Sequence, residues 1–296
     1  MEIIVFGVIS GCIILFGALG FSMTLKAEGF INVAHGQMLL LGAYLALYFS
    51  SLGVPLIIAT IIAVLCCGVI GVLIFRLLYQ PVKARGILVL LFTSVGVAYA
   101  LNGIVGAVFG KRVQAYDLPP VRAMKFDGVP LMTIYELMII VFALLAAVGI
   151  HVFLTWTWIG KSIRAVADNY DLARVRGFDP KRSSDYVWFI ASALAGLAGV
   201  FSGILGSLHL NMGWQQIIII LAATVLGGLG SIYGVMLASM LLGIGMELAI
   251  TIDLAGYTLP ASYRSAVAFV IIIAILFLRP EGLQSLWNPQ RAGGDR

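Results

Sequence analysis

The sequence predicts an all-α, polytopic membrane protein that forms a single transmembrane domain over residues 1–296. Of the 296 residues, 61% are hydrophobic and only 10% are charged, and the mean hydropathy of +1.08 lies well above that of soluble domains. The charges gather in short stretches between long apolar runs. The net charge of +5 therefore reflects membrane topology and not nucleic acid, which requires a basic face with stacking aromatics on a soluble scaffold.

Eight apolar runs are long enough to cross a hydrocarbon core of about 30 Å. They are residues 3–25, 30–51, 54–78, 86–110, 131–158, 187–208, 231–252 and 264–279. A ninth, Ile217 to Leu226, is too short for a full crossing and is interpreted as a half-helix or re-entrant segment. Because Glu2 stands where a signal peptide carries Lys or Arg, the first run is expected to remain as a helix. The prediction is eight or nine transmembrane elements.

Basic loops set the expected orientation. The turn with Arg76, Lys83 and Arg85, the six-cation loop at 161–182 and Arg279 are all cytoplasmic under the positive-inside rule. The N-terminus is then outside and the C-terminus cytoplasmic. Residues 111–130 carry four cations against two acids, yet parity places them outside.

Two stretches suggest an inverted internal repeat. "INVAHGQMLLLGAYLA" and "NMGWQQIIIILAATVLGG" share a polar start, an apolar run and a small-residue end, and each follows a Gly-rich helix. Five crossings between them invert the second half relative to the first. Inverted repeats that meet at broken helices are typical of transporters.

Polar residues interrupt the apolar sequence between residues 29 and 45. Asn32, His35, Gly36 and Gln37 lie there, and an unpaired polar group in hydrocarbon costs several kcal/mol. A broken helix that lines a substrate path explains them, and so does hydrogen bonding to neighbouring helices. A metal site at His35 is not expected, because no second ligand has the required spacing.

The loop at 159–186 is expected to be a cytoplasmic coupling element. Residues 161–176 predict one amphipathic helix, with Gly177 as its stop and Pro180 beyond it. Such a helix lies in lipid headgroups or docks on a protein, and four acids in the loop favour a protein. Gly160-Lys161-Ser162 only imitates a P-loop, because the pattern lacks its first glycine and preceding strand. No nucleotide site and no catalytic arrangement is predicted.

An autonomous carrier driven by an ion gradient is a competing hypothesis. It needs an intramembrane acid, and Glu136 and Glu247 are the candidates. Both lie near the ends of their runs, where they reach water. A third hypothesis is a non-transporting membrane scaffold, in which the glycines serve packing alone.

Four segments together resemble one family. "GFSMTLKAEGFINVAHGQMLLLGAYLA", "RAVADNYDLARVRGFDP", "VLGGLGSIYGVMLASMLLG" and "LFLRPEGL" are similar, in the same order, to segments of branched-chain amino acid ABC importer permeases of the LivH type. Asp171, Ala173 and Gly177 resemble the docking-loop pattern of importer permeases, although Leu172 replaces the usual Ala.

The resemblance implies a non-enzymatic permease of the prokaryotic inner membrane. It implies a second, LivM-like permease, two LivG/LivF-like ATP-binding subunits and an extracytoplasmic solute-binding protein. ATP and Mg would bind the partner subunits, and this chain would carry no cofactor or metal. Relatives of the group also import urea, other amides or aromatic acids, so these solutes stay open beside branched-chain and other hydrophobic amino acids.

Two sets of candidate site residues follow. The predicted substrate pathway comprises Asn32, His35, Gly36, Gln37, Asn211, Thr224, Gly227, Gly228 and Ser231. The predicted ATPase-coupling residues are Arg164, Asp168, Asp171, Ala173, Arg174 and Gly177.

Overall fold

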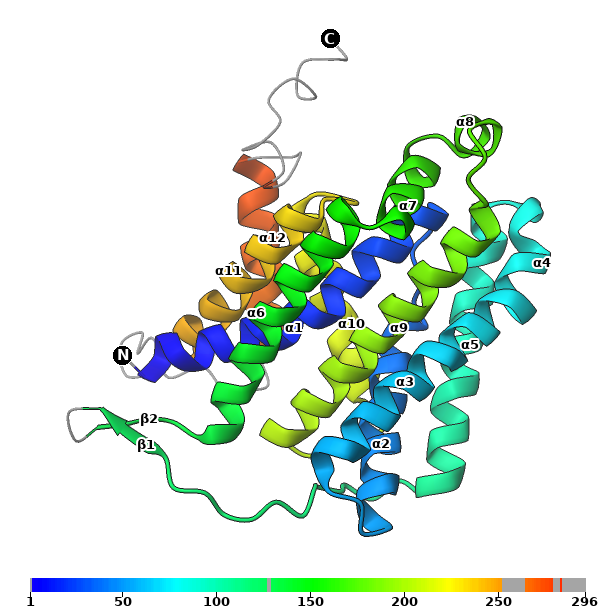
Figure 1. The fold of residues 1–296 in the computed structure, drawn as a ribbon. Coiled ribbons are helices and arrows are strands. Elements are labelled where there is room, and N and C mark those ends of the chain that lie inside the picture. Colours follow the sequence, from blue (N-terminus) through cyan, green and yellow to red (C-terminus); the bar gives the residue numbers. More distant parts are fainter. Residues whose placement is uncertain (1, 127–128, 252–263, 279–282, 284–296) are drawn as a thin grey trace.

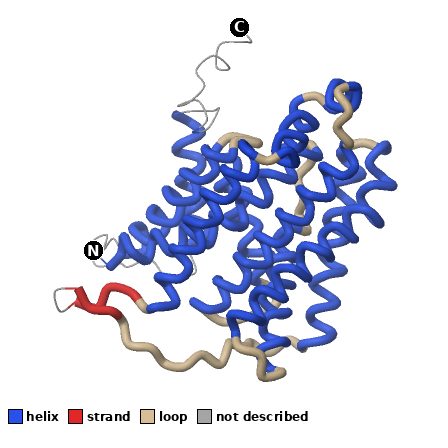
Figure 2. Tube along the Cα trace, in the orientation of Figure 1, coloured by secondary structure: helices blue, strands red, loops and turns tan. Residues whose placement is uncertain are grey.

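The computed structural model describes residues 2–126, 129–251, 264–278 and 283. These residues form a bundle of helices with one short β-hairpin at its edge, as Figure 1 and Figure 2 show. Six helices in the described part are long and apolar enough to cross a membrane. The all-α, multi-pass class is therefore confirmed, and the number of eight or nine crossings stays a prediction. Arg279 and half of the terminal "LFLRPEGL" motif, residues 279–282, lie outside the described residues.

The element bounds follow the predicted apolar runs closely. In chain order the helices are α1 (Glu2–Glu28), α2 (His35–Ser51), α3 (Leu56–Ile74), α4 (Gln80–Val82), α5 (Ile87–Phe109), α6 (Ile134–Trp156), α7 (Trp158–Asp168), α8 (Tyr170–Val175), α9 (Pro180–Leu205), α10 (Met212–Gly227), α11 (Ile232–Thr251) and α12 (Arg264–Leu278). A π-helical turn, Phe75–Tyr79, extends α3 toward α4. Strands β1 (Met124–Phe126) and β2 (Val129–Met132) pair antiparallel.

Helix α9 starts seven residues before the predicted run at 187–208. Asp179 is its N-cap, with Oδ1 accepting the Lys181 N–H at 3.0 Å, and Pro180 occupies the first helical position. Proline fits there because the first helical N–H has no intrahelical acceptor. Helix α9 thus begins within residues 180–186, a polar segment that hydropathy assigns to the loop.

The prediction of one helix over 161–176 is wrong. Helix α7 ends one residue before Asn169, whose backbone is extended at φ −156°. The Asn169 side chain accepts the Leu172 N–H at 2.9 Å, so Asn169 is the N-cap of a separate helix, α8. The predicted stop is confirmed, because Gly177 has a φ of +84°, a conformation that favours glycine.

Close helix packing relates the two halves of the bundle. Helix α1 lies along α11, and α9 lies along α3. An added Cβ at Gly243 would overlap the backbone of Gly11 at the first contact, and one at Gly71 would overlap Ser192 at the second. Figure 1 shows α1 and α9 running in opposite directions. This is the arrangement that the inverted repeat predicts, with α1, α2 and α3 matched to α9, α10 and α11.

The two ends of the bundle differ. At one end lie the β-hairpin and the loop before α6, and at the other lie α4, α7 and α8 (Figure 1). The predicted cytoplasmic loops meet at this second end, because Arg76 Nη2 lies 2.6 Å from Asp185 Oδ2. Lys83 Nζ likewise lies 2.6 Å from Glu28 Oε2 at the end of α1. The basic loops therefore share one face of the bundle, as the orientation prediction requires.

Candidate substrate pathway and coupling surface

The first helix break covers residues 29–34, between α1 and α2. Gly29 leaves the helix with a φ of +73°. Asn32 is buried, and its Oδ1 accepts both the Tyr79 hydroxyl at 3.0 Å and the Ala34 N–H at 3.1 Å. The Tyr79 ring stacks on Trp188. Asn32 therefore replaces missing backbone hydrogen bonds within the break, which is the packing alternative stated above.

The residues that follow the break belong to the first turn of α2. His35 is buried, and its Nε2 donates to the Gly17 carbonyl oxygen at 2.9 Å. This bond fixes α2 to the middle of α1. Helix α2 has 17 residues, a length of about 26 Å, which is shorter than the hydrocarbon core of about 30 Å. It begins inside the bundle and ends at the end that carries the β-hairpin (Figure 1).

The second break covers residues 206–211, between α9 and α10. Leu208 forms a two-way backbone bridge with Gln114 of the loop before the hairpin. Helix α10 has 16 residues, a length of about 24 Å. Its C-terminus lies at the end of the bundle that carries α4, α7 and α8, which we call the coupling end. There Gly230 lies against Lys26. Asn211 is exposed at the start of α10.

The two broken helices meet at their N-termini. A Cβ on Gly36 would overlap the Gly213 carbonyl oxygen, so the two backbones touch. Asn102 of α5 joins the two breaks, since its Nδ2 donates to Leu210 O at 2.8 Å and to Gln37 Oε1 at 3.3 Å. The Gln37 amide nitrogen is buried and has no partner among the described residues. The structure thus brings Gly36, Gln37 and the start of α10 together inside the bundle.

The remaining predicted pathway residues lie elsewhere, at the far end of α10. Thr224 is buried and donates to Ile220 O of its own helix at 2.9 Å. Gly227 packs against the backbone of α11, and Gly228 turns the chain with a φ of +97°. Ser231 Oγ accepts the Gly234 N–H at 3.2 Å, at the start of α11. These four residues shape the α10–α11 turn and do not adjoin the junction at Gly36.

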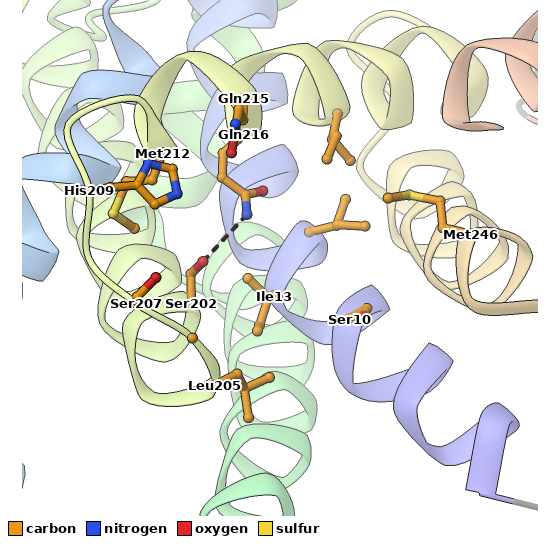
Figure 3. A pocket seen from close by; sticks show the side chains of 13 residues that line it. Ser10, Ile13, Ser202, Leu205, Ser207, His209, Met212, Gln215, Gln216 and Met246 are labelled. Carbon is orange, nitrogen blue, oxygen red and sulfur yellow. Dashed lines mark hydrogen bonds between the residues drawn. The ribbon is translucent and has the colours of Figure 1, made fainter. Parts of the chain in front are cut away.

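A polar cavity of about 390 Å³ lies beside the second break, between α1, α9, α10 and α11. Figure 3 shows Ser10, Ser202, His209, Gln215 and Gln216 around it, with Met212 and Met246 on its apolar sides. The Gln216 amide donates to Ser202 Oγ at 3.4 Å.

Sequence reasoning missed these cavity residues. The signal was present, because two adjacent amides, Gln215 and Gln216, precede the apolar run of α10. They were interpreted only as the polar start of a repeat. The contribution of Ser10 and Ser202 depends on helix packing, which the sequence does not display.

The predicted coupling residues divide between two helices. Arg164 and Asp168 lie on α7, where Asp168 Oδ1 is 3.9 Å from Lys26 Nζ of α1. Asp171 and Arg174 are exposed on α8, which projects from the bundle (Figure 1).

Helix α8 presents apolar as well as charged side chains. Leu172 is 54% exposed and Val175 is 83% exposed, whereas Ala173 is only 2% exposed and packs inward. Exposed apolar side chains of this kind mark interaction surfaces when they cluster. Gly177 follows at the end of the same projection.

The two acids of the ion-coupled hypothesis have structural partners. Glu136 forms a capping box with Thr133, in which its carboxylate accepts the Thr133 N–H at 2.6 Å. Glu247 Oε1 accepts the Ser10 hydroxyl at 3.1 Å. Within the described residues, no group of three or more His, Cys, Asp or Glu side chains has a metal-binding arrangement.

The chain is similar in sequence to permease proteins of branched-chain amino acid transport systems. The chain is 27% identical over 286 residues to the high-affinity branched-chain amino acid transport system permease protein LivH of Salmonella typhimurium, covering 90% of this chain and 89% of the relative. Its identity to BraD of Pseudomonas aeruginosa is 27% over 281 residues, covering 90% and 89%. A probable LivH of Methanocaldococcus jannaschii is 24% identical over 284 residues, covering 90% and 86%.

A solved structure, PsaBC from Streptococcus pneumoniae in complex with Fab, aligns with 98% of this chain and 92% of that chain. Its TM-score of 0.47 at 16% identity is too low to establish a shared fold. The family model for the permease component of branched-chain amino acid transport systems matches residues 3–276. The chain therefore belongs to the branched-chain amino acid transport system permease family.

Proposed function

We propose that this chain is the membrane subunit of an ATP-driven ABC importer for branched-chain or other hydrophobic amino acids. Family membership and the similarity to the transport permeases LivH and BraD support this proposal. The structural observation that supports it most is α8, a projecting helix at the end of the bundle that carries the basic loops. Its exposed side chains are both apolar and charged. Exposed apolar side chains of this kind favour contact with a partner protein over contact with water.

The substrate pathway of the proposal runs from the polar cavity toward the junction of the broken helices. Hydroxyl and amide groups of Ser202, Gln215 and Gln216 suit the charged main-chain groups of an amino acid, and Met212 suits an apolar side chain. A volume of about 390 Å³ lies in the range of small-molecule sites. The contact of Gly36 with the start of α10 closes the path below the cavity.

Coupling enters through α8 in this proposal. Asp171, Leu172, Arg174 and Val175 contact an ATP-binding partner directly, and Ala173 and Gly177 hold the helix in shape. Arg164 and Asp168 lie next to α1 on α7, so they transmit movement of α8 to the bundle.

The remaining parts of the assembly lie outside this chain. We assign ATP and Mg to two ATP-binding subunits, the second half of the conduit to a homologous permease, and solute delivery to an extracytoplasmic binding protein. The basic loops face the cytoplasm and the hairpin end faces outward, which places the N-terminus outside and the C-terminus inside. The polar cavity, near the end of α9, then opens toward the binding protein.

The proposal is tested by Val175→Asp in the assembled transporter. Val175 is 83% exposed, so a carboxylate there leaves the membrane bundle intact but disrupts an apolar contact. Loss of one interface anchor costs about 2 kcal/mol or more, about 30-fold in affinity. We expect ATPase subunits to stop copurifying and ATP-dependent uptake to fall by a similar factor.

Val113→Asp is the matched control. Val113 is 65% exposed in the loop at the opposite end, and its variant should still copurify with the ATPase subunits. Wild-type copurification and uptake by Val175→Asp would overturn the docking role of α8. The solute itself is identified by the ligand that copurifies with the adjacent binding protein.

A further inference from the structure

A second cavity, of about 280 Å³, lies at the coupling end of the bundle. The ends of α1 and α6, helix α7 and the α10–α11 turn surround it, and Figure 1 shows the first three elements meeting there. It is separate from the polar cavity beside the second break, and none of the functions above uses it as a binding site.

The wall of this cavity is basic and rich in hydrogen-bond donors. Lys26 and Arg164 lie on it, and Arg164 forms no ion pair within the described part of the chain. Ser231 and Tyr233 add hydroxyl groups, and the Tyr233 hydroxyl is hydrogen-bonded to His151 Nδ1 at 2.6 Å. The first turn of α11 also begins here. Ser231 Oγ accepts the Gly234 N–H, so the Ile232 and Tyr233 N–H groups are the first-turn donors that lack an intrahelical acceptor and carry partial positive charge.

Charge balance favours a monoanion. Among the described residues, Asp168 is the acid within ion-pair distance of these cations, 3.9 Å from Lys26. Two cations and one carboxylate leave one net positive charge. A phosphodiester carries one negative charge, so it neutralises the net positive charge of the site. A dianionic phosphate would leave the site with a net negative charge.

Apart from these groups, His151 and Thr155, the lining is apolar. Met23, Leu154, Ile163 and Ile232 face the cavity together with the basic residues. A free inorganic anion gains nothing from these side chains. The first carbons of a lipid acyl chain, by contrast, bury against them, at about 0.8 kcal/mol for each buried CH₂ group.

The depth of the cavity matches a membrane interface. Trp156 at the end of α6 is 79% exposed and Trp158 at the start of α7 is 73% exposed. Exposed tryptophans at the end of a membrane-spanning helix mark the headgroup level. His151, Leu154 and Thr155 of the cavity lie within about one and a half turns of Trp156.

We propose that this cavity binds the headgroup phosphate of an anionic glycerophospholipid, such as phosphatidylglycerol. Lys26 and Arg164 pair with the phosphodiester, and the start of α11 donates to it. The bound lipid links α7, the base of the coupling projection, to α1, α6 and α11. Basic pockets between transmembrane helices on the cytoplasmic side suit this class of ligand.

The test is native mass spectrometry of the full-length chain, released from bilayers of equal phosphatidylglycerol and phosphatidylcholine. We expect phosphatidylglycerol to be retained in preference to phosphatidylcholine. Each cation that pairs with the phosphodiester contributes about fivefold in affinity. Lys26→Gln and Arg164→Gln should each weaken retention about fivefold, and the double variant should weaken it further than either single change.

Lys161→Gln is the matched control, because Lys161 is exposed on the same helix, one turn before Arg164, and does not line the cavity. Retention should be unchanged in this variant, and Arg164→Lys should recover most of the affinity. Equal retention of the two lipids would overturn the proposal. So would an equal effect of Lys161→Gln, or displacement of the lipid by millimolar inorganic phosphate, which would indicate a free-anion site.

Discussion

The contact between the two broken helices makes Gly36 the most sensitive position in the proposed pathway. A Cβ at Gly36 would overlap the Gly213 carbonyl oxygen and lie 2.7 Å from Ile217 Cβ. Helix α10 must therefore retreat by several tenths of an ångström or more. The Gln37–Asn102 hydrogen bond, at 3.3 Å, has no slack to absorb the shift.

The cost of Gly36→Ala follows from these two losses. Overpacking by one methyl group typically costs about 1–3 kcal/mol, and losing a hydrogen bond adds about 1 kcal/mol. The gain in helix propensity from Gly to Ala offsets up to about 1 kcal/mol. The net loss is about 1–3 kcal/mol, which corresponds to a fall in Tm of about 2–6 °C at roughly 2 °C per kcal/mol for a large chain.

Gly96→Ala isolates the clash. Gly96 lies in α5, and a Cβ there meets no atom within 4 Å, so this variant gains helix propensity without overpacking. We expect its Tm to stay level or rise slightly, and its uptake to match that of the unmodified chain. The assay is thermal unfolding in detergent followed by ATP-dependent uptake in proteoliposomes. Equal Tm and uptake for the two variants would refute the close contact at Gly36.

Three further variants test separate parts of the account. Tyr79→Phe removes the 3.0 Å bond to Asn32 but keeps the ring stack, so the free energy of unfolding should fall by about 1 kcal/mol; an unchanged Tm argues against this bond. Arg76→Ala breaks the pair with Asp185, in which Arg76 is 58% exposed. The free energy of unfolding of this variant should fall by at most about 1 kcal/mol, and the difference should shrink in high salt. A large fall that does not depend on salt would contradict a surface pair. Glu247→Gln should leave uptake ATP-dependent and insensitive to ionophores; ionophore-sensitive uptake by the unmodified chain supports the ion-coupled alternative instead.

Apolar length and polar interruptions predicted most of the fold. Six of the eight predicted spans coincide with long helices in the described residues, because about 20 apolar residues suit no other environment. The runs at 30–51 and 264–279 contain the shorter helices α2 and α12. Asn32 lies in the first break, but His35, Gly36 and Gln37 belong to the first turn of α2. The second break, at 206–211, ends at Asn211, where the sequence indicated only the polar start of a repeat. The match between these breaks also predicted opposed halves, and α1 and α9 do run in opposite directions.

The sequence alone could not predict which distant residues form hydrogen bonds with each other. Asn32 and His35 indicated a break, but their acceptor and donor groups come from Tyr79 and Gly17, which only packing brings close. The break at Asn169 was missed because the flanking residues favour a helix, so a single N-cap side chain decided the outcome. The Thr133–Glu136 capping box was readable at its three-residue spacing, and it explains an acid that had been weighed for ion coupling.

The most direct test of the account is uptake of labelled leucine by proteoliposomes that contain the complete transporter. We predict uptake that requires ATP inside, at the face that carries α8, together with the binding protein outside, and that persists when ionophores dissipate sodium and proton gradients. Uptake that continues without ATP and collapses with those gradients would contradict it.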